Sequence, residues 1–528
     1  MNPPVPWWRD AVLYQIYPRS FMDSGGDGIG DIKGITSRLD HLVWLGVEGI
    51  WLNPTMPSPN KDWGYDVADY TAVDLELGTM DDLDELIARA DDAGIRVLLD
   101  LVPNHTSDRH PWFVDAASSR DSEHRDWYVW ADPKPDGSPP NNWVSVFGGD
   151  GAWEWHEPTG RYYLHNFLGE QPDLNWWNDD VRATFDDILR FWFDRGVAGF
   201  RIDVAHALVK DRELRDNPPA QPGDNAHWRE LGQQVVYNMN RPEGHEILRR
   251  WRVLAGEYEP GRVLVGETYV WEIAQLMSFY GNDDELHLAF NFLFAHAPFD
   301  ATALRAVVEE TYENLPALAA SVWFGSNHDA RRFATRWCGE DERKIRCALL
   351  VLLTLHGACF LYYGDEIGMP DTRITEADLK DPVGVRFWPD DPGRDPCRTP
   401  MHWSASDGAG FTDAGVKPWL PIGDNLACNV EAQRDDPNST LHLCRDLIAL
   451  RKHADDLRSA PYEGVDAPPG LWAFRRGRHI VVLNMNDAAA RLDTGPGTVV
   501  IATNRARDGE RVAAAVQLAP WEGLVVGT

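Results

Sequence analysis

Four acidic residues occupy positions where a barrel enzyme would place its reactive groups. Asp100, Asp203, Glu267 and Asp329 each lie at or just past the end of a short apolar run that predicts a β-strand. In a barrel of parallel strands, catalytic groups sit at the carboxyl ends of the strands. Hydrolysis of a glycoside with retention needs a carboxylate nucleophile and a carboxylic acid that donates a proton. One such acid alone would more often be a helix cap or an ion-pair partner, but four at equivalent positions favour acid chemistry.

The elements that must position these acids are short β-rich runs that alternate with helical patterns. Amphipathic segments such as 35–45, 83–93 and 181–195 repeat apolar residues three and four positions apart. Strands that alternate with helices are typical of parallel βαβ units, and eight units predict an α/β fold, a closed (β/α)8 TIM barrel. The predicted strands are 12–17, 49–52, 96–101, 199–203, 263–267, 286–291, 322–326 and 359–363.

Two intervals are too long to be simple connections between barrel elements. The segment after the third strand is rich in Trp, Pro, Gly and Asn and predicts an inserted domain beside the barrel mouth. The proline-rich segment 364–437 predicts an irregular excursion before the last barrel helix. Short alternating stretches near the end of the chain predict an antiparallel β-sandwich domain. The predicted division is a barrel in two parts, 1–103 and 177–453, an inserted domain 104–176 and a carboxy-terminal domain 454–528.

Composition excludes several classes of partner. The 528 residues include 50 basic and 83 acidic side chains, for a formal net charge of −33. This charge repels phosphate backbones and anionic lipids, so we expect no nucleic-acid or membrane partner and a neutral ligand. No apolar run approaches the roughly 20 residues of a membrane span.

The segment 1–10 lacks the basic stretch and apolar core of a secretory signal, which predicts a cytoplasmic protein. The six cysteines show no CxxC spacing and are predicted to be reduced.

Seven ordered blocks resemble those of the α-amylase family of glycoside hydrolases, family 13, and within it the oligo-1,6-glucosidase and α-glucosidase branch. The resemblance covers almost the whole chain. It implies a retaining, exo-acting α-glucosidase that releases glucose from the non-reducing ends of short α-1,4 or α-1,6 glucosides. The blocks are Asp-Leu-Val-Pro-Asn-His at 100–105, Gln-Pro-Asp-Leu-Asn at 171–175, Gly-Phe-Arg-Ile-Asp at 199–203, Gly-Glu-Thr at 266–268, Ser-Asn-His-Asp at 326–329, Gly-Asp-Glu-Ile-Gly at 364–368 and the stretch 394–401.

The resemblance implies that Asp203 is the nucleophile, Glu267 the acid/base and Asp329 a third acid that grips the sugar hydroxyls. Arg201 lies two residues before Asp203 on the same strand face, so it can keep that carboxylate ionised. Glu267 has no cation beside it in the sequence. A less polar surrounding and a neighbouring carboxylate would hold it protonated near neutral pH, as a general acid requires.

The resemblance also implies a pocket that closes around the terminal glucose. Tyr65 looks like the family's stacking platform, and Asp62 and Arg398 look like the pair that closes the pocket. A closed pocket means that the enzyme acts from the chain end. The other residues implied to contact the sugar are His105, Phe147, Phe167, Arg201 and His328.

The segment 23–31 alternates carboxylates with glycines, as loops that bind a hard cation through oxygen do. It resembles the family's Ca2+ or Mg2+ loop, which implies one structural cation bound by Asp23, Asp27, Ile29 and Asp31. Gly25 stands where relatives commonly have Asn, which removes one side-chain oxygen, and an empty glycine-rich turn is the alternative. No organic cofactor is expected.

Other functions share parts of this pattern. A transglucosidase or a sucrose or maltose isomerase would use the same covalent intermediate, but segment 330–337 lacks the Arg-Leu-Asp-Arg-Asp pattern of sucrose isomerases. Non-catalytic relatives that escort membrane transporters have a membrane span and typically lack the acids. Val204 favours α-1,6 cleavage, yet Ala205 and His206 depart from the Ile-Asn of typical α-1,6 enzymes. We therefore expect mixed activity on maltose and isomaltose, and the sequence does not predict the oligomeric state.

Overall fold

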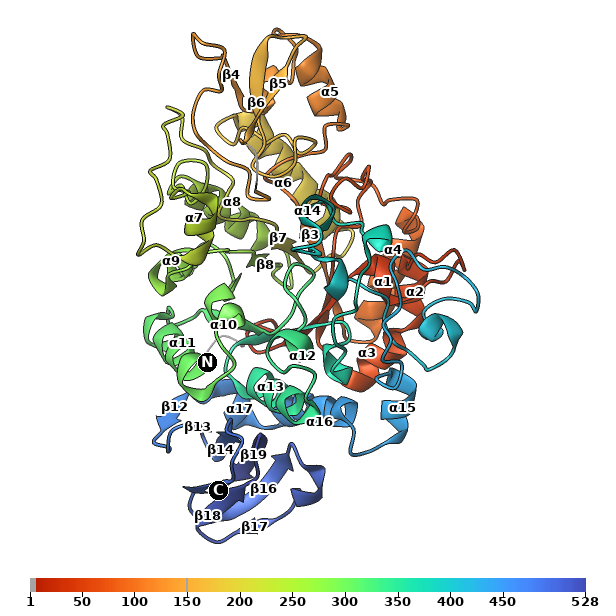
Figure 1. Cartoon of the computed structure of the whole chain (residues 1–528), viewed down its shortest axis with the longest axis vertical. Helices are drawn as coiled ribbons and strands as arrows, with labels where there is room; N and C mark the ends of the chain where they lie inside the picture. Colours follow the sequence, from red (N-terminus) through yellow and green to blue (C-terminus); the bar gives the residue numbers. More distant parts are fainter. Residues whose placement is uncertain (1–5, 149–150) are drawn as a thin grey trace.

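The centre of the molecule is a closed barrel of eight parallel strands in the order β1-β11-β10-β9-β8-β7-β3-β2 (Figure 1). The computed structural model describes residues 6–148 and 151–528; residues 1–5 of the segment 1–10 and residues 149–150 of the inserted segment lie outside this description. The predicted (β/α)8 barrel is thereby confirmed. Its strands are β1 (Val12–Ile16), β2 (Gly49–Leu52), β3 (Arg96–Leu101), β7 (Gly199–Ile202), β8 (Val263–Gly266), β9 (Leu288–Phe290), β10 (Ala320–Phe324) and β11 (Ala358–Tyr362).

The barrel interior is a packed core. Strand residues are buried on both faces, because helices cover the outside and side chains of alternate strands fill the inside. An apolar cluster that includes Trp51, Val265, Phe290 and Phe360 fills the space between the strands. Polar side chains are therefore confined to the ends of the strands.

Helices surround the barrel, and the amphipathic segment 35–45 is divided between two of them. Two helices, α2 (Ile32–Ser37) and α3 (Leu39–Leu45), meet at Arg38, which has φ −106° and ψ 8°. This break lets the Arg38 guanidinium lie 4.4 Å from the ring centre of Trp403 and donate to the carbonyl of Gly410 at 3.2 Å. The other large barrel helices are α4 (Met80–Asp92), α6 (Asp179–Asp194), α8 (Gly244–Ala255), α11 (Ala301–Asn314), α13 (Glu342–Thr354) and α16 (Thr440–His453).

The remaining helices are short and lie in connections. Within 364–437 the described helices are the 3-10 turns and two short α-helices, α14 and α15, as expected for an irregular excursion. The short α-helices of all the connections are α1 (Pro18–Phe21), α5 (Pro111–Ser118), α7 (Ala226–Leu231), α9 (Ile273–Ser278), α10 (Phe292–His296), α12 (Phe333–Arg336), α14 (Pro382–Phe387), α15 (Val430–Asp435) and α17 (Asp455–Ser459).

The chain between β3 and α6 forms a small inserted unit at one end of the molecule (Figure 1). It holds α5 and a three-stranded antiparallel sheet in the order β4-β6-β5. Trp143, Trp153 and Leu164 form its own apolar core. The strands are β4 (Trp130–Ala131), β5 (Trp153–His156) and β6 (Arg161–Leu164).

The carboxy-terminal domain is antiparallel, as predicted, and joins a six-stranded to a two-stranded sheet. Leu492 and Leu518 of the small sheet pack against Val482 and Val526 of the large one in a shared core. The large sheet has the order β12-β13-β14-β19-β16-β17. The strands are β12 (Glu463–Val465), β13 (Leu471–Arg476), β14 (His479–Asn484), β15 (Ala490–Asp493), β16 (Gly497–Ala502), β17 (Arg511–Val512), β18 (Ala515–Leu518) and β19 (Glu522–Gly527).

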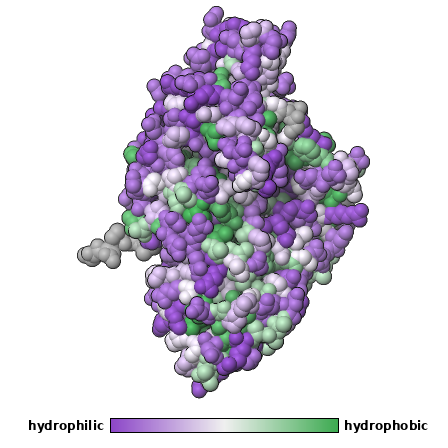
Figure 2. All heavy atoms as spheres, turned by 60° about the vertical axis from the view of Figure 1, so that its left-hand side comes forward, coloured by the Kyte–Doolittle hydropathy of each residue, from purple (hydrophilic) through white to green (hydrophobic). Residues whose placement is uncertain are grey.

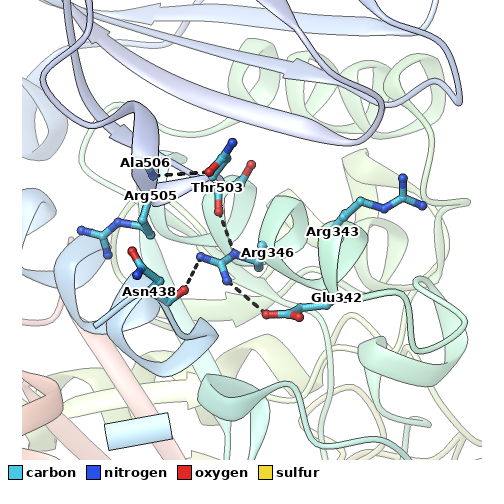
Figure 3. A pocket seen from close by; sticks show the side chains of 8 residues that line it. Glu342, Arg343, Arg346, Asn438, Thr503, Arg505 and Ala506 are labelled. Atoms are coloured by element: carbon cyan, nitrogen blue, oxygen red, sulfur yellow. Dashed lines mark hydrogen bonds and ion pairs between the residues drawn. The ribbon is translucent and has the colours of Figure 1, made fainter. Parts of the chain in front are cut away.

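Helix α13 joins the barrel to this domain through arginines. At its start, Arg346 donates to the carbonyls of Thr503 and Asn438 at 2.7 and 2.8 Å and pairs with Glu342 at 3.1 Å (Figure 3). These residues line a pocket of about 330 Å3 between the two domains. At the far end of the helix, Arg476 of β13 donates to the carbonyl of Thr354 at 3.0 Å.

A second buried arginine, Arg451 of α16, donates hydrogen bonds to carbonyl groups at the end of α13. It donates to the carbonyls of Asp10, Leu353 and Leu355 at 3.0, 3.1 and 2.6 Å, and also to that of Gly357. The last carbonyls of a helix have no intrahelical partner, so guanidinium donors satisfy groups that would otherwise be buried without hydrogen bonds.

The face of the molecule shown in Figure 2 is mainly hydrophilic. Figure 2 shows one face on which hydrophobic residues form only small scattered patches. All six cysteines are free, as predicted. In the described ranges, no helix combines the length and the apolar character needed to cross a membrane.

We predict that Arg451→Met lowers the free energy of unfolding by about 3 kcal/mol, because several carbonyls would stay buried without a donor. Denaturant unfolding followed by circular dichroism measures the change. The control is Arg89→Met on α4, whose guanidinium is half exposed and pairs only with Glu85 at 3.5 Å. That variant should change stability by less than about 1 kcal/mol, and equal losses in the two variants would contradict the assigned role of Arg451.

Candidate active site

The four predicted acids lie at the carboxyl ends of barrel strands, and three of them meet at one buried arginine. Arg201 Nη1 lies 2.9 Å from Oδ1 of Asp100 and 2.6 Å from Oδ1 of Asp203. Nη2 of the same guanidinium lies 2.8 Å from Oε2 of Glu267. Asp329 follows β10 at the same end of the barrel and contacts other cations. The structure therefore gathers the acids that the sequence singled out.

Strand register explains this arrangement. Asp100 of β3 is the Cα partner of Arg201 of β7, so both side chains point to the same side of the sheet. The backbone N–H groups of Asp203 and Glu267 extend the ladder by donating to neighbouring strands at 2.8 and 2.9 Å. Val204 then turns the chain with φ 36°, an uncommon value for a β-branched residue. Its N–H donates to Oε2 of Glu267 at 2.9 Å, so the turn orients that carboxyl.

The electrostatics differ from the expectation based on sequence. Arg201 contacts Glu267 as well as Asp203, because pairing of β7 with β8 brings Glu267 beside it. Burial raises the pKa of Asp203 well above its ordinary value; Arg201 opposes this rise, and the nearby carboxyls of Glu267 and Asp100 add to it. Burial likewise raises the pKa of Asp100 to about 6 against the pull of Arg201. Arg201 contacts Asp203 as expected, but burial outweighs it and favours the protonated form of Asp203, contrary to the expectation that Arg201 keeps this carboxylate ionised.

Asp329 has a more cationic environment. Its Oδ1 lies 3.0 Å from Nη2 of Arg398 and 3.3 Å from Nη1 of Arg394, and its Oδ2 lies 3.1 Å from Nε2 of His328. Burial opposes ionisation, yet these neighbours hold the pKa of Asp329 below its ordinary range. Asp329 is therefore the carboxylate that stays charged and free to accept hydrogen bonds.

Asp62 contacts Arg394 rather than Arg398 in this structure, and the closing of a pocket around glucose by Asp62 and Arg398 stays a prediction. Arg394 Nη2 lies 2.6 Å from Oδ1 of Asp62, whereas Arg398 donates to the carbonyl of His328 at 2.8 Å and to Asp329. Both arginines lie in the stretch 394–401, and spacing alone does not distinguish which of them reaches Asp62. Arg394 is thus a site residue that sequence reasoning missed.

Aromatic and amide side chains complete the site. The hydroxyl of Tyr65 donates to Oδ2 of Asp100 at 2.9 Å and lies 2.5 Å from Nε2 of His328, whose ring stacks on Tyr65 at 5.2 Å. His105 lies 3.1 Å from Nε2 of Gln171, which also donates to Asp62 at 3.1 Å. Gln171 is a second missed residue, since the block 171–175 was identified but given no role.

Phe147 and Phe167 extend from the inserted domain to this end of the barrel. The two rings are 5.4 Å apart, and Phe167 lies 5.1 Å from the ring of His105. The guanidinium of Arg394 lies 5.0 Å from the ring centre of Phe147. All of the residues predicted to contact the sugar therefore lie in one connected group, in which Asp62 contacts Arg394 and Arg398 contacts Asp329.

The predicted cation loop is a turn whose carboxylates bond to the chain itself. Asp23 accepts hydrogen bonds from the N–H groups of Gly25, Gly26 and Gly28 at 2.8, 2.7 and 2.8 Å. Asp31 accepts from Gly34 at 2.6 Å, and the N–H of Ile29 donates to Asp27 at 2.9 Å. Within 6–148 and 151–528, no group of three or more His, Cys, Asp or Glu side chains could hold a metal ion. The predicted ligands, Asp23, Asp27, Ile29 and Asp31, lie in this turn, and cation binding by them stays a prediction.

Paired carboxyls and a shared guanidinium lie at the carboxyl ends of the strands of a parallel barrel. This arrangement is that of a glycoside hydrolase. Residues 15–460 match the model of the alpha amylase catalytic domain. The chain belongs to the α-amylase family of glycoside hydrolases, in the oligo-1,6-glucosidase branch.

Curated relatives and a solved structure agree with this placement. The chain is 43% identical to a probable alpha-glucosidase of Rhizobium meliloti (strain 1021), over 93% of this chain and 91% of the relative. It is 37% identical to an oligo-1,6-glucosidase of Heyndrickxia coagulans, over 92% and 93% of the two chains. The crystal structure of an alpha-glucosyl transfer enzyme, XgtA, superposes with a TM-score of 0.92 at 38% identity and covers 99% of this chain and 100% of that one.

We predict that the loop 23–31 of the wild-type protein binds no cation, because Gly25 supplies no side-chain oxygen. A Cβ at Gly25 would lie 3.7 Å from Oδ1 of Asp23 and 4.0 Å from the carboxyl of Asp27, so an Asn there adds an oxygen between them. EDTA should leave the Tm of the wild-type protein unchanged, whereas 1 mM CaCl2 should raise the Tm of Gly25→Asn by about 2 °C. Calorimetry with elemental analysis measures both, and a bound ion lost from the wild-type protein with a fall in Tm would refute the prediction.

Proposed function

We propose that the protein is a retaining, exo-acting α-glucosidase that releases glucose from the non-reducing ends of short, neutral α-1,4 and α-1,6 glucosides. The observation that carries the proposal is the fork of Arg201, which holds Asp203 and Glu267 through adjacent nitrogens. One guanidinium keeps the two carboxyls close, which suits the spacing of about 5 to 5.5 Å in retaining enzymes.

In this mechanism Asp203 attacks the anomeric carbon while Glu267 gives its proton to the leaving oxygen, which produces a covalent glucosyl-enzyme. Glu267 then takes a proton from a water molecule, and that water displaces Asp203. The first step requires that Asp203 is ionised and that Glu267 holds the proton that it donates. Asp203 loses its negative charge when it forms the bond to the anomeric carbon. Arg201 stays paired with Asp100 during this step, which limits the electrostatic free-energy cost of that loss.

Exo action is supported by the closed end of the site. Asp62 is buried and held from two sides, by Arg394 at 2.6 Å and by Gln171 at 3.1 Å. Asp329, His328 and Arg398 form a second polar group that suits the hydroxyls of one glucose ring. Charged, hydrogen-bonding walls at the closed end favour a single terminal glucose over a chain that passes through.

A second candidate function is glucosyl transfer to an acceptor other than water. It is favoured by the likeness of the chain to the alpha-glucosyl transfer enzyme XgtA. Both functions share the covalent intermediate and differ in what attacks it. Product analysis with and without a large excess of an alcohol or sugar acceptor distinguishes them, because a transferase forms new glucosides at low acceptor concentration while a hydrolase releases mainly glucose.

We predict that Asp203→Asn folds normally but retains less than about a thousandth of the wild-type kcat on p-nitrophenyl α-glucoside, because an amide forms no glucosyl ester. Circular dichroism establishes folding. Asp187→Asn on the outer face of α6 is the control and should keep full activity. Adding azide to Asp203→Ala should produce β-glucosyl azide, since the small anion attacks from the vacated side. If Asp203→Asn keeps several per cent of the wild-type activity, Asp203 is not the nucleophile.

We predict that the sugar first released from p-nitrophenyl α-glucoside is α-glucose, because two displacements at the anomeric carbon restore its configuration. Proton NMR within the first minutes of reaction, before mutarotation, measures the anomer. Early β-glucose would show a single displacement and rule out the retaining mechanism while leaving the enzyme class intact.

A further inference from the structure

Gln15 of β1 is a buried side chain that contacts His328 at the ring nitrogen opposite Asp329. Its Nε2 lies 2.9 Å from Nδ1 of His328 and 2.9 Å from Oδ1 of Asn53. Gln15 and Asn53 are each 1% exposed, and His328 is fully buried. Strand β11 lies between β1 and β10 in the barrel, so Gln15 reaches across it to the loop that follows β10. A buried amide at this place must find its hydrogen-bond partners inside the protein.

The other ring nitrogen of His328 faces two oxygens. Nε2 lies 2.5 Å from the hydroxyl of Tyr65 and 3.1 Å from Oδ2 of Asp329. The Tyr65 hydroxyl donates its single proton to Oδ2 of Asp100 at 2.9 Å and accepts from Nδ2 of Asn53 at 2.8 Å. The hydroxyl therefore has no second proton to give to His328. Nε2 must carry the proton of that contact.

The ring of His328 is neutral. Burial lowers its pKa well below the ordinary value; the carboxylate of Asp329 opposes this shift, and three guanidinium groups add to it. A neutral imidazole carries a single N–H. If Nε2 carries that proton, Nδ1 has a free lone pair that only a donor can satisfy. The titratable groups that face the ring are Asp329, Arg201, Arg394, Arg398, Tyr17 and Tyr65.

The reversed tautomer does not fit these contacts. With the proton on Nδ1, the lone pair of Nε2 would face Oδ2 of Asp329, and the single proton of the Tyr65 hydroxyl would have to serve two acceptors. The amide of Gln15 would have to turn its oxygen to Nδ1, and the amide of Asn53 would have to turn with it. The orientation in which Gln15 donates gives every contact one proton.

We propose that Gln15 is a positioning residue that fixes the tautomer of His328: its amide donates to Nδ1, so the ring proton stays on Nε2 and is donated toward Asp329 and the Tyr65 hydroxyl. The catalytic consequence rests on the proposed glucosidase function. A neutral donor orients the Asp329 carboxylate without cancelling its charge, and a charged carboxylate stabilises a cation-like transition state better than a neutralised one. Gln15 therefore acts on the reaction through His328.

The direct test is nitrogen NMR of the wild-type protein with isotope-labelled histidines, because protonated and unprotonated ring nitrogens give separate signals. His328→Gln identifies the signals that belong to His328. We expect an unprotonated Nδ1 and a protonated Nε2 near pH 7. In Gln15→Met, which has a similar length but no donor, both tautomers should be populated. A protonated Nδ1 in the wild-type protein would overturn the inference.

A second test follows kcat on p-nitrophenyl α-glucoside as a function of pH. Gln15→Met should lower kcat about tenfold at every pH, the effect of one lost hydrogen bond. In Gln15→Glu the new carboxylic acid donates to Nδ1 at low pH, whereas its anion accepts the ring proton and reverses the tautomer. The ratio of the kcat of Gln15→Glu to that of the wild-type protein should therefore fall as the pH rises. A ratio that is independent of pH, or a wild-type kcat in Gln15→Met, would refute the role of Gln15.

Gln233→Met is the matched control, because Gln233 is also a buried glutamine. It donates to the carbonyl of Asn142 and accepts from Nδ2 of Asn217, both at 2.8 Å. This variant should keep the wild-type tautomer of His328 and the wild-type pH profile. An equal loss of kcat in Gln233→Met and Gln15→Met would assign the loss to any missing buried amide and contradict the proposal.

The two experiments separate this inference from the function on which it rests. If the wild-type protein cleaves no α-glucoside, the proposed glucosidase function fails, and the NMR signals of His328 still decide the tautomer. Circular dichroism establishes that each variant folds. If a Gln15 variant does not fold, the wild-type NMR measurement alone confirms or overturns the placement of the proton.

Discussion

One buried guanidinium determines the organisation of the active site. Arg201 is bonded to Asp100, Asp203 and Glu267, and without it three carboxyls at the mouth of a low-dielectric barrel would repel one another. The strands β3, β7 and β8 must pair in their observed register for these contacts to form. Fold and chemistry therefore constrain each other, because a one-residue slip would turn these side chains to the other face of the sheet.

Around this centre, groups of opposite character serve separate tasks. Burial and neighbouring carboxyls raise the pKa of Asp203 beside Arg201, whereas His328, Arg394 and Arg398 hold the pKa of Asp329 below its ordinary range. Arg394 links the site to its surroundings, since it contacts Asp62 from the loop after β2, Asp381 from α14 and Phe147 from the inserted domain. The inserted domain and the irregular segment 364–437 thus take part in the site rather than only decorating the barrel.

The sequence predicted most of the scaffold, because strands buried on both faces leave short apolar runs and each catalytic acid follows one. Strand ends matched within a few residues. Contacts between distant segments were harder to predict: the partner of Asp62 lies more than 300 positions away, and spacing does not choose between Arg394 and Arg398. The break at Arg38 depends on a contact with Trp403, which helical periodicity does not reveal. The cation loop stays a prediction, because the carboxylates that would bind an ion also accept hydrogen bonds from their own turn.

The closure of the barrel has a consequence for synthesis of the chain. Strand β1 pairs with β11, and the carbonyl of Asp10 accepts from Arg451, so the first strand finds its second neighbour only when residues 358–362 are made and the last donor only at residue 451. Until then one edge of β1 stays open, which is a template for unwanted strand pairing. Such long-range closure slows folding. The nascent chain must therefore be protected from aggregation for most of its time on the ribosome, and the barrel becomes a single cooperative unit only after α16 has emerged.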